Sequence, residues 1–115
     1  MSAKRFRLIA LALPDVVEGS HRGHADFRLE KRIFATLGYP DDDWGMVKLT
    51  PEQQSVLVEA EPEIFRPVPG GWGKQGSTNV RLAKADAATL KSALSLAWRN
   101  VAPKSLIDIP QKKKS

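Results

Sequence analysis

The sequence predicts a two-layer α+β domain in which a mostly antiparallel sheet of about five strands carries three helices, mainly on one face. Three observations lead to this fold class. Apolar residues recur with helical spacing near both ends of the chain and after residue 50, and they alternate with polar residues between these segments. The strand-like segments are joined by short connections rather than helical crossovers, which favours antiparallel pairing. A chain of 115 residues is also long enough to enclose one hydrophobic core.

The first half of the chain is predicted to form one helix followed by strands. Residues 3–13 have apolar side chains at helical spacing, and Pro14 ends this helix. The predicted strands of this half are residues 16–22, 26–30, 33–37 and 44–49, and the short gap between the second and third indicates a hairpin. Residues 38–43, between the third and fourth strands, have the composition of a loop. In the fourth strand, Val47 and Leu49 face the core if Lys48 faces outward.

The second helix has the clearest start signal. Thr50 is its cap, Pro51 occupies the first helical position, and Gln53 completes a capping box. The helix is expected to reach about Ala60. Its buried side is predicted to include Leu57 and Ala60, and also Ile64 if the chain continues past Pro62 as a separate turn.

A proline- and glycine-rich loop over residues 66–76 and a strand over residues 78–82 are predicted to precede the last helix. Asp86 caps that helix, and Pro103 ends it. Its apolar stripe consists of Leu90, Leu94, Ala97, Trp98 and Val101.

Composition predicts one domain over residues 1–107 and a flexible basic tail over residues 108–115. The chain carries a net charge of +5, with most acidic residues gathered in the segment 41–63. It contains no cysteine, which excludes disulfides, thiolate metal sites and cysteine nucleophiles. We find no apolar run long enough to cross a bilayer and no secretory signal, so a cytoplasmic protein is expected.

The residues 69–78 form the most informative segment. Four glycines in this segment give the backbone conformational freedom that other residues lack. A loop that only reversed the chain would need neither Trp72 nor Lys74. The segment is therefore predicted to hold an indole and an ammonium group at one edge of the sheet.

Catalytic and metal-binding patterns are weak in this sequence. His21 and His24 lie three residues apart in an extended region, which directs their rings differently and does not favour a zinc site. The acidic run 41–43 lacks the alternation of a calcium loop. No nucleophile elbow and no phosphate-binding glycine loop is present. We therefore expect no enzymatic activity, cofactor or bound metal.

Basic residues at strand positions are more informative. Arg28, Lys48 and Arg81 each lie between two apolar residues, so strand alternation places all three on the face opposite the core. If the three strands are neighbours in the sheet, this pattern predicts a cationic patch, which Trp72 and Lys74 would extend. The alternative is an ordinary polar outer face, which nearby acidic residues partly neutralise, with Trp72 covering the sheet edge.

Several segments, taken in order, resemble the MmcQ/YjbR-like proteins, a group of small bacterial proteins mostly of uncharacterised function. The matching segments are residues 10–14 with Glu18 and His21, residues 26–28 and 33–35, residues 48–53, Pro69-Gly70 with Trp72-Gly73 and Gly76, and residues 97–99 and 101–104. The chain departs from the family pattern at Arg22, Ala25 and Ser77. The resemblance implies a fold similar to that of the frataxin-like CyaY proteins, and a double-wing arrangement proposed to bind DNA.

These observations lead us to expect a non-enzymatic nucleic-acid-binding domain, one that prefers duplex DNA with little sequence specificity. The alternative is an adaptor without catalytic activity that binds a protein or small ligand through the Trp72 loop and the acidic segment 41–63. In either case a monomer without a membrane partner is expected. The candidate nucleic-acid-binding residues are Arg22, Arg28, Lys48, Trp72, Lys74, Arg81, Arg99 and Lys104.

Overall fold

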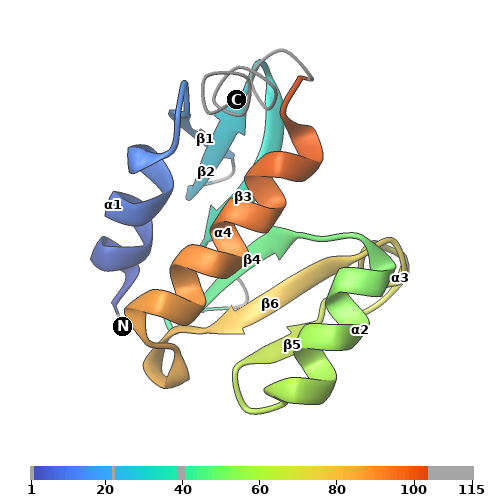
Figure 1. Cartoon of the computed structure of the whole chain (residues 1–115). Coiled ribbons are helices and arrows are strands. Elements are labelled where there is room, and N and C mark those ends of the chain that lie inside the picture. Colours follow the sequence, from blue (N-terminus) through green and yellow to red (C-terminus); the bar gives the residue numbers. More distant parts are fainter. Residues whose placement is uncertain (1, 22, 39–40, 104–115) are drawn as a thin grey trace, which may run out of the picture.

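In the computed structural model, which describes residues 2–21, 23–38 and 41–103, six antiparallel strands form a sheet in the order β1-β2-β3-β4-β6-β5 (Figure 1). The strands are β1 (Val17–His21), β2 (His24–Leu29), β3 (Arg32–Leu37), β4 (Trp44–Lys48), β5 (Phe65–Pro67) and β6 (Ser77–Arg81). The helices are α1 (Ala3–Ala12), α2 (Pro51–Ala60), α3 (Gly71–Lys74) and α4 (Ala87–Val101), with a 3-10 turn at Leu82–Lys84.

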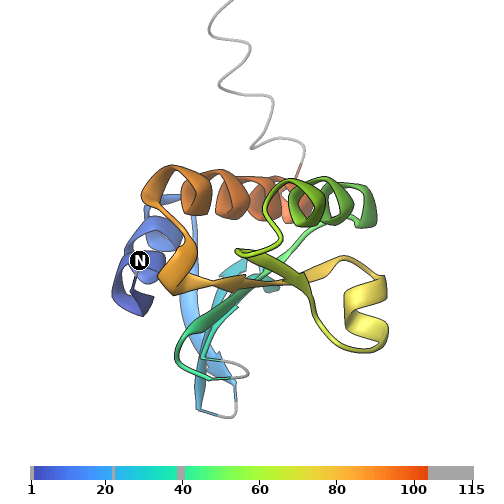
Figure 2. The same cartoon turned by 90° about the horizontal axis from the view of Figure 1, so that it is seen from below.

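The two long helices α2 and α4 cover the same face of the sheet. Figure 2 shows α4 and α2 above the strands, whereas α3 lies at one end of the sheet and below it. Helix α4 packs on β3 and β4, α1 packs against α4, and α2 packs against β5. The core between these layers is built from fully buried side chains, among them Phe6, Phe27, Phe34, Leu90 and Leu94. Within the described residues, no long helix lies over the opposite face of β4, β6 and β5.

The β2–β3 connection is a tight hairpin. Leu29 pairs with Arg32, and the two residues between them, Glu30 and Lys31, have φ angles of 49° and 72°. Positive φ at both central residues is typical of the type I′ turn, whose twist matches that of paired strands. The hairpin predicted from the sequence is therefore confirmed.

The start of α2 is also confirmed at the level of single hydrogen bonds. The Gln53 backbone N–H donates to Thr50 Oγ1 at 3.1 Å, and the Thr50 backbone N–H donates to Gln53 Oε1 at 3.0 Å. Pro51 occupies the first turn, where its missing N–H costs no helical hydrogen bond. The helix ends at Ala60 as expected, but Ala60 is exposed rather than buried, and Leu57 is only partly buried.

The α+β class and the mostly antiparallel sheet are confirmed, with corrections to the count of elements. The described residues form six strands and four α-helices, where about five strands and three helices were predicted. The extra elements, β5 and α3, lie inside or overlap the segment 66–76 that was predicted to be a loop. Several boundaries move by one or two residues, and α1 ends at Ala12. The tail 108–115 lies outside the described residues.

Candidate nucleic-acid interface

The side of β4, β6 and β5 that faces away from the core carries cations and an indole. Register places Trp44 opposite Arg81, Met46 opposite Asn79, Lys48 opposite Ser77, and Arg66 opposite Asn79. Between these positions, Val47, Val80 and Phe65 point into the core. We call the outward set the open face; it consists of Trp44, Met46, Lys48, Arg66, Ser77, Asn79 and Arg81.

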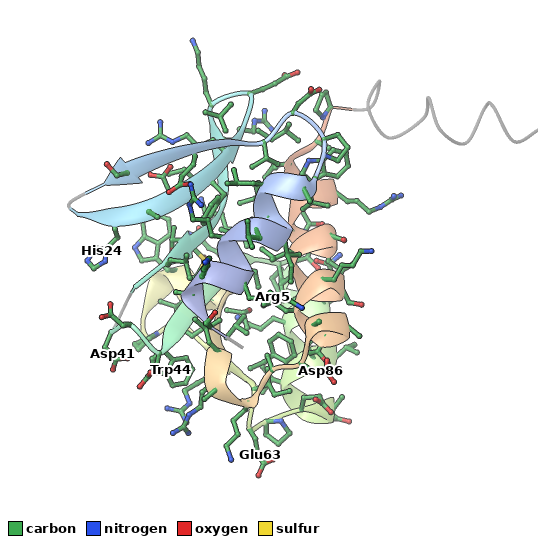
Figure 3. The ribbon with its side chains drawn as sticks, turned by 90° about the vertical axis from the view of Figure 1, so that its left-hand side faces the viewer. Arg5, His24, Asp41, Trp44, Glu63 and Asp86 are labelled. Carbon is green, nitrogen blue, oxygen red and sulfur yellow. The ribbon has the colours of Figure 1, made fainter. Side chains whose placement is uncertain are left out.

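At one end of the open face, two guanidinium groups lie over one indole. The Cζ atoms of Arg66 and Arg81 are 5.2 Å and 5.8 Å from the centroid of the Trp44 ring. In Figure 3, Trp44 lies on the side of the sheet away from α4. Contacts of this kind are attractive, because the negative ring face meets a cation that is poorly hydrated. We call these three residues the Trp44 cluster.

At the other end of the open face, an ammonium group lies over a second indole. The Nζ atom of Lys48 is 5.8 Å from the centroid of the Trp72 ring. The indole of Trp72 is 64% exposed, so most of its surface is available to a ligand. Trp72 is therefore not enclosed by the sheet. Its cationic neighbour is Lys48 of the sheet, whereas Lys74 is exposed at the end of α3.

Close packing fixes the turn that carries Trp72. The side-chain amide of Gln54, on α2, donates to the carbonyl oxygens of Gly73 and Ser77, each at 3.0 Å. A Cβ atom on Gly73 would lie 1.7 Å from the carbonyl oxygen of Val68, so no larger residue fits there. Gly76 has a φ angle of 114°, and a Cβ atom there would meet the Leu49 carbonyl at 1.9 Å. Gly73 and Gly76 thus allow close backbone approach, and Gly76 also has a positive φ angle. These contacts hold α3, and with it the indole, in place.

The Trp44 cluster and a second cluster, which consists of Lys48 and Trp72, lie at opposite ends of β4, so one extended ligand can reach both. Trp44 and Lys48 are the first and last residues of β4, which separates the clusters by about 13 Å at ~3.3 Å per residue. Within the described residues, no carboxylate forms an ion pair with Lys48, Arg66, Lys74 or Arg81. Their charges are therefore available to an anionic partner.

Arg28 also lies on the outward side of the sheet, but unlike Arg66 and Arg81 it forms an ion pair with a carboxylate. Its Nε donates to Asp26 Oδ1 at 2.7 Å and its second terminal nitrogen donates to Oδ2 at 3.1 Å. The hydrogen bond to Asp26, reinforced by the charge of that carboxylate, raises the pKa of the Arg28 guanidinium. Asp26 is fully buried and needs this cation as its partner. Arg28 is therefore part of an internal ion pair of the sheet and not a free cation.

The structure brings some of the other candidate residues together and separates the rest. Lys48, Trp72 and Arg81 belong to the two clusters, and Lys74 lies next to one of them. Arg99 is exposed on α4, in the helical layer on the other side of the sheet. Arg22 and Lys104 lie outside the described residues.

Sequence reasoning missed Trp44, Arg66 and Asn79 as open-face residues. The period of two that placed Lys48 outward also places Trp44 outward, so that signal was available. Arg66 was not recognised as a strand residue, because the nearby Pro67 and Pro69 are typical of a loop. Asn79 is 5% exposed, and its Oδ1 atom has no hydrogen-bond partner within the described residues.

No group of three or more histidine, aspartate or glutamate residues is close enough to hold a metal ion in residues 2–21, 23–38 and 41–103. None of the helices in the described part of the chain is long and apolar enough to span a membrane.

The fold and this surface define a small two-layer α+β domain whose exposed sheet face carries cations and tryptophans. The chain belongs to the YjbR family, whose sequence model matches residues 11–100. The crystal structure of the Deinococcus radiodurans protein DR2400, a DUF419 protein, has a similar fold: the TM-score is 0.73 at 22% identity, over 90% of this chain and 80% of DR2400. No curated protein matches the sequence.

Proposed function

We propose that this protein is a non-enzymatic nucleic-acid-binding domain whose ligand is DNA. The observation that supports this most strongly is the pair of tryptophan–cation clusters on one open face, with cations that no described carboxylate neutralises. Arginine and lysine suit phosphate oxygens, and an indole offers a face on which a base can stack. Nucleic acid presents both groups repeatedly along one chain, so a single strand could contact both ends of the open face.

The side chains of the two clusters favour binding with little sequence specificity. Contacts to phosphate position a protein on DNA without reading its sequence, and stacking tolerates every base. Lys48, Arg66, Lys74 and Arg81 would contact phosphates. If four phosphates are neutralised on duplex DNA, the logarithm of the binding constant falls against the logarithm of salt concentration with a slope of about −3.6.

The experiment is a fluorescence-anisotropy salt titration with labelled duplex DNA. The test variant reverses two open-face charges, Lys48→Glu with Arg81→Glu. The control variant, Lys4→Glu with Lys91→Glu, changes the net charge equally on exposed positions of α1 and α4. We expect weakened binding and a slope shallower by about 2 only for the open-face variant. Equal losses in both variants would show that net charge, not this face, attracts DNA, and affinity independent of salt would refute the proposal.

A further inference from the structure

A recess opens beside Trp72, where β4 passes into α2. Its volume is about 150 Å³, and its walls include Lys48, Thr50, Trp72, Gln75, Ser77 and Asn100. Three parts of the chain meet here: residues 48–50, residues 72–77, and Asn100 in the last turn of α4. The Asn100 amide donates to the Lys48 carbonyl oxygen at 3.0 Å and to Gln53 Oε1 at 2.8 Å, which holds this wall in place.

The chemistry of the recess suits a flat, neutral, hydrogen-bonding ring next to a negative charge. One wall is an exposed indole, and the single charged wall residue is the Lys48 ammonium. Within the described residues, the side chains of Gln75, which is exposed, and Ser77, which is buried at the recess wall, make no hydrogen bonds, so both can bond to a ligand that enters the recess. A cavity of about 150 Å³ is known to admit a single aromatic ring such as benzene.

We propose that this recess receives one unpaired nucleobase of a bound DNA strand, and that Lys48 contacts the phosphate of the same nucleotide. This inference rests on the proposed function and specifies its substrate class. A base inside a duplex has both faces stacked and its pairing edge occupied, so it cannot enter the recess unless it leaves the stack. Single-stranded DNA, or a duplex with an overhang, is therefore preferred to a closed duplex, contrary to the preference expected from the sequence.

The recess selects for an unpaired base without selecting which base. An amide and a hydroxyl each donate and accept, so Gln75 and Ser77 can bond to any base edge. The indole contributes stacking, which is sequence-tolerant and amounts to about tenfold in affinity per base. Because Gln54, Gly73 and Gly76 fix α3, the recess exists before binding and little ordering is required.

The test compares three labelled probes of one sequence: the single strand, the blunt duplex, and the duplex with a single-stranded overhang. Anisotropy titrations are made on the wild-type chain, on Trp72→Ala, and on Trp72→Phe, which keeps a stacking ring. Because Trp72 is 64% exposed, these variants are expected to fold, which thermal unfolding verifies. We expect the wild type to bind the single strand and the overhang about tenfold more tightly than the blunt duplex.

In Trp72→Ala we expect about a tenfold loss on the two probes with unpaired bases, a loss of less than about twofold on blunt duplex, and recovery in Trp72→Phe. Salt-dependent duplex binding with no preference for unpaired bases, or equal losses on all three probes, would overturn the base-binding recess and leave the proposed function standing. Failure of the wild type to bind any of the probes would refute both.

Discussion

The guanidinium of Arg28 forms two hydrogen bonds with the carboxylate of Asp26, two residues earlier on the same strand. The carboxylate is fully buried, whereas the arginine side chain keeps part of its surface in solvent. Arg81 lies on the same side of the sheet, but its contact is the Trp44 ring and no carboxylate within the described residues. Two arginines on one surface thus have different partners.

The first prediction compares Arg28→Gln with Arg81→Gln. Removing Arg28 leaves the Asp26 carboxylate buried without a cation, which is unfavourable, so Arg28→Gln lowers the melting temperature. It leaves the salt dependence of DNA binding unchanged. Arg81→Gln leaves the melting temperature nearly unchanged and makes the log–log salt slope shallower by about 1. Circular dichroism melts and anisotropy titrations measure the two effects; the reverse pattern would place the DNA contact at Arg28.

The second prediction concerns the glycines of α3. A methyl group on Gly73 would clash with the Val68 backbone, which cannot move aside as a side chain can. Gly73→Ala is therefore expected to lower the free energy of unfolding by about 1–3 kcal/mol. Gly71→Ala is the matched control, since its Cβ atom would meet nothing within 4 Å and alanine favours a helix by about 0.5–1 kcal/mol.

Chemical denaturation measures both variants. An unchanged free energy of unfolding in Gly73→Ala would mean that α3 is displaced easily and that Trp72 is not held rigidly.

The elements that the sequence predicted well are those defined by local chemistry. Thr50, Pro51 and Gln53 encode the start of α2 within four residues, and Asp86 marks the start of α4 with a single carboxylate. Strand alternation placed Lys48 and Arg81 on one side of the sheet, because that period depends only on the backbone pleat.

The elements that the sequence did not predict depend on contacts between distant residues. Pro67 argues against a strand, yet β5 is an edge strand whose missing donor is tolerated. The turn α3 is rich in glycine and owes its position to Gln54, which lies on α2. The contact of Arg66 with Trp44 requires the register of the sheet, and the contact of Lys48 with Trp72 requires the position of α3. No local pattern contains either.

The third prediction concerns Asn79, whose buried Oδ1 atom has no partner within the described residues. A buried unsatisfied acceptor costs about 1–3 kcal/mol, so Asn79→Leu is expected to raise the free energy of unfolding by about 1 kcal/mol. Thr78 provides the contrast, because its buried hydroxyl donates to the Gly76 carbonyl at 2.8 Å and accepts from Gln54 at 3.1 Å. Thr78→Val should lower the free energy of unfolding by about 1 kcal/mol.

Urea unfolding of both variants measures the contrast between the adjacent positions. If Asn79→Leu is as destabilising as Thr78→Val, the amide oxygen of Asn79 has a hydrogen-bond partner in solution.

The fourth prediction concerns pH and the cap of α4. The Thr89 backbone N–H donates to Asp86 Oδ1 at 2.7 Å, and this bond to the ionised form lowers the pKa of Asp86 below its ordinary value of 3.8. A carboxyl group whose pKa is lower in the folded state stabilises that state above its unfolded pKa, and the effect is lost as the pH falls through the folded pKa. Asp86→Asn also caps a helix, but it cannot titrate and lacks the negative charge that favours a helix N-terminus.

The wild type should therefore melt at a higher temperature than Asp86→Asn from neutral pH down to about pH 4, and this advantage should disappear at more acid pH. Melting temperatures of both proteins across that range, at low ionic strength, measure the difference; a difference that stays constant into the acid range would mean that the charge of Asp86 contributes nothing to α4.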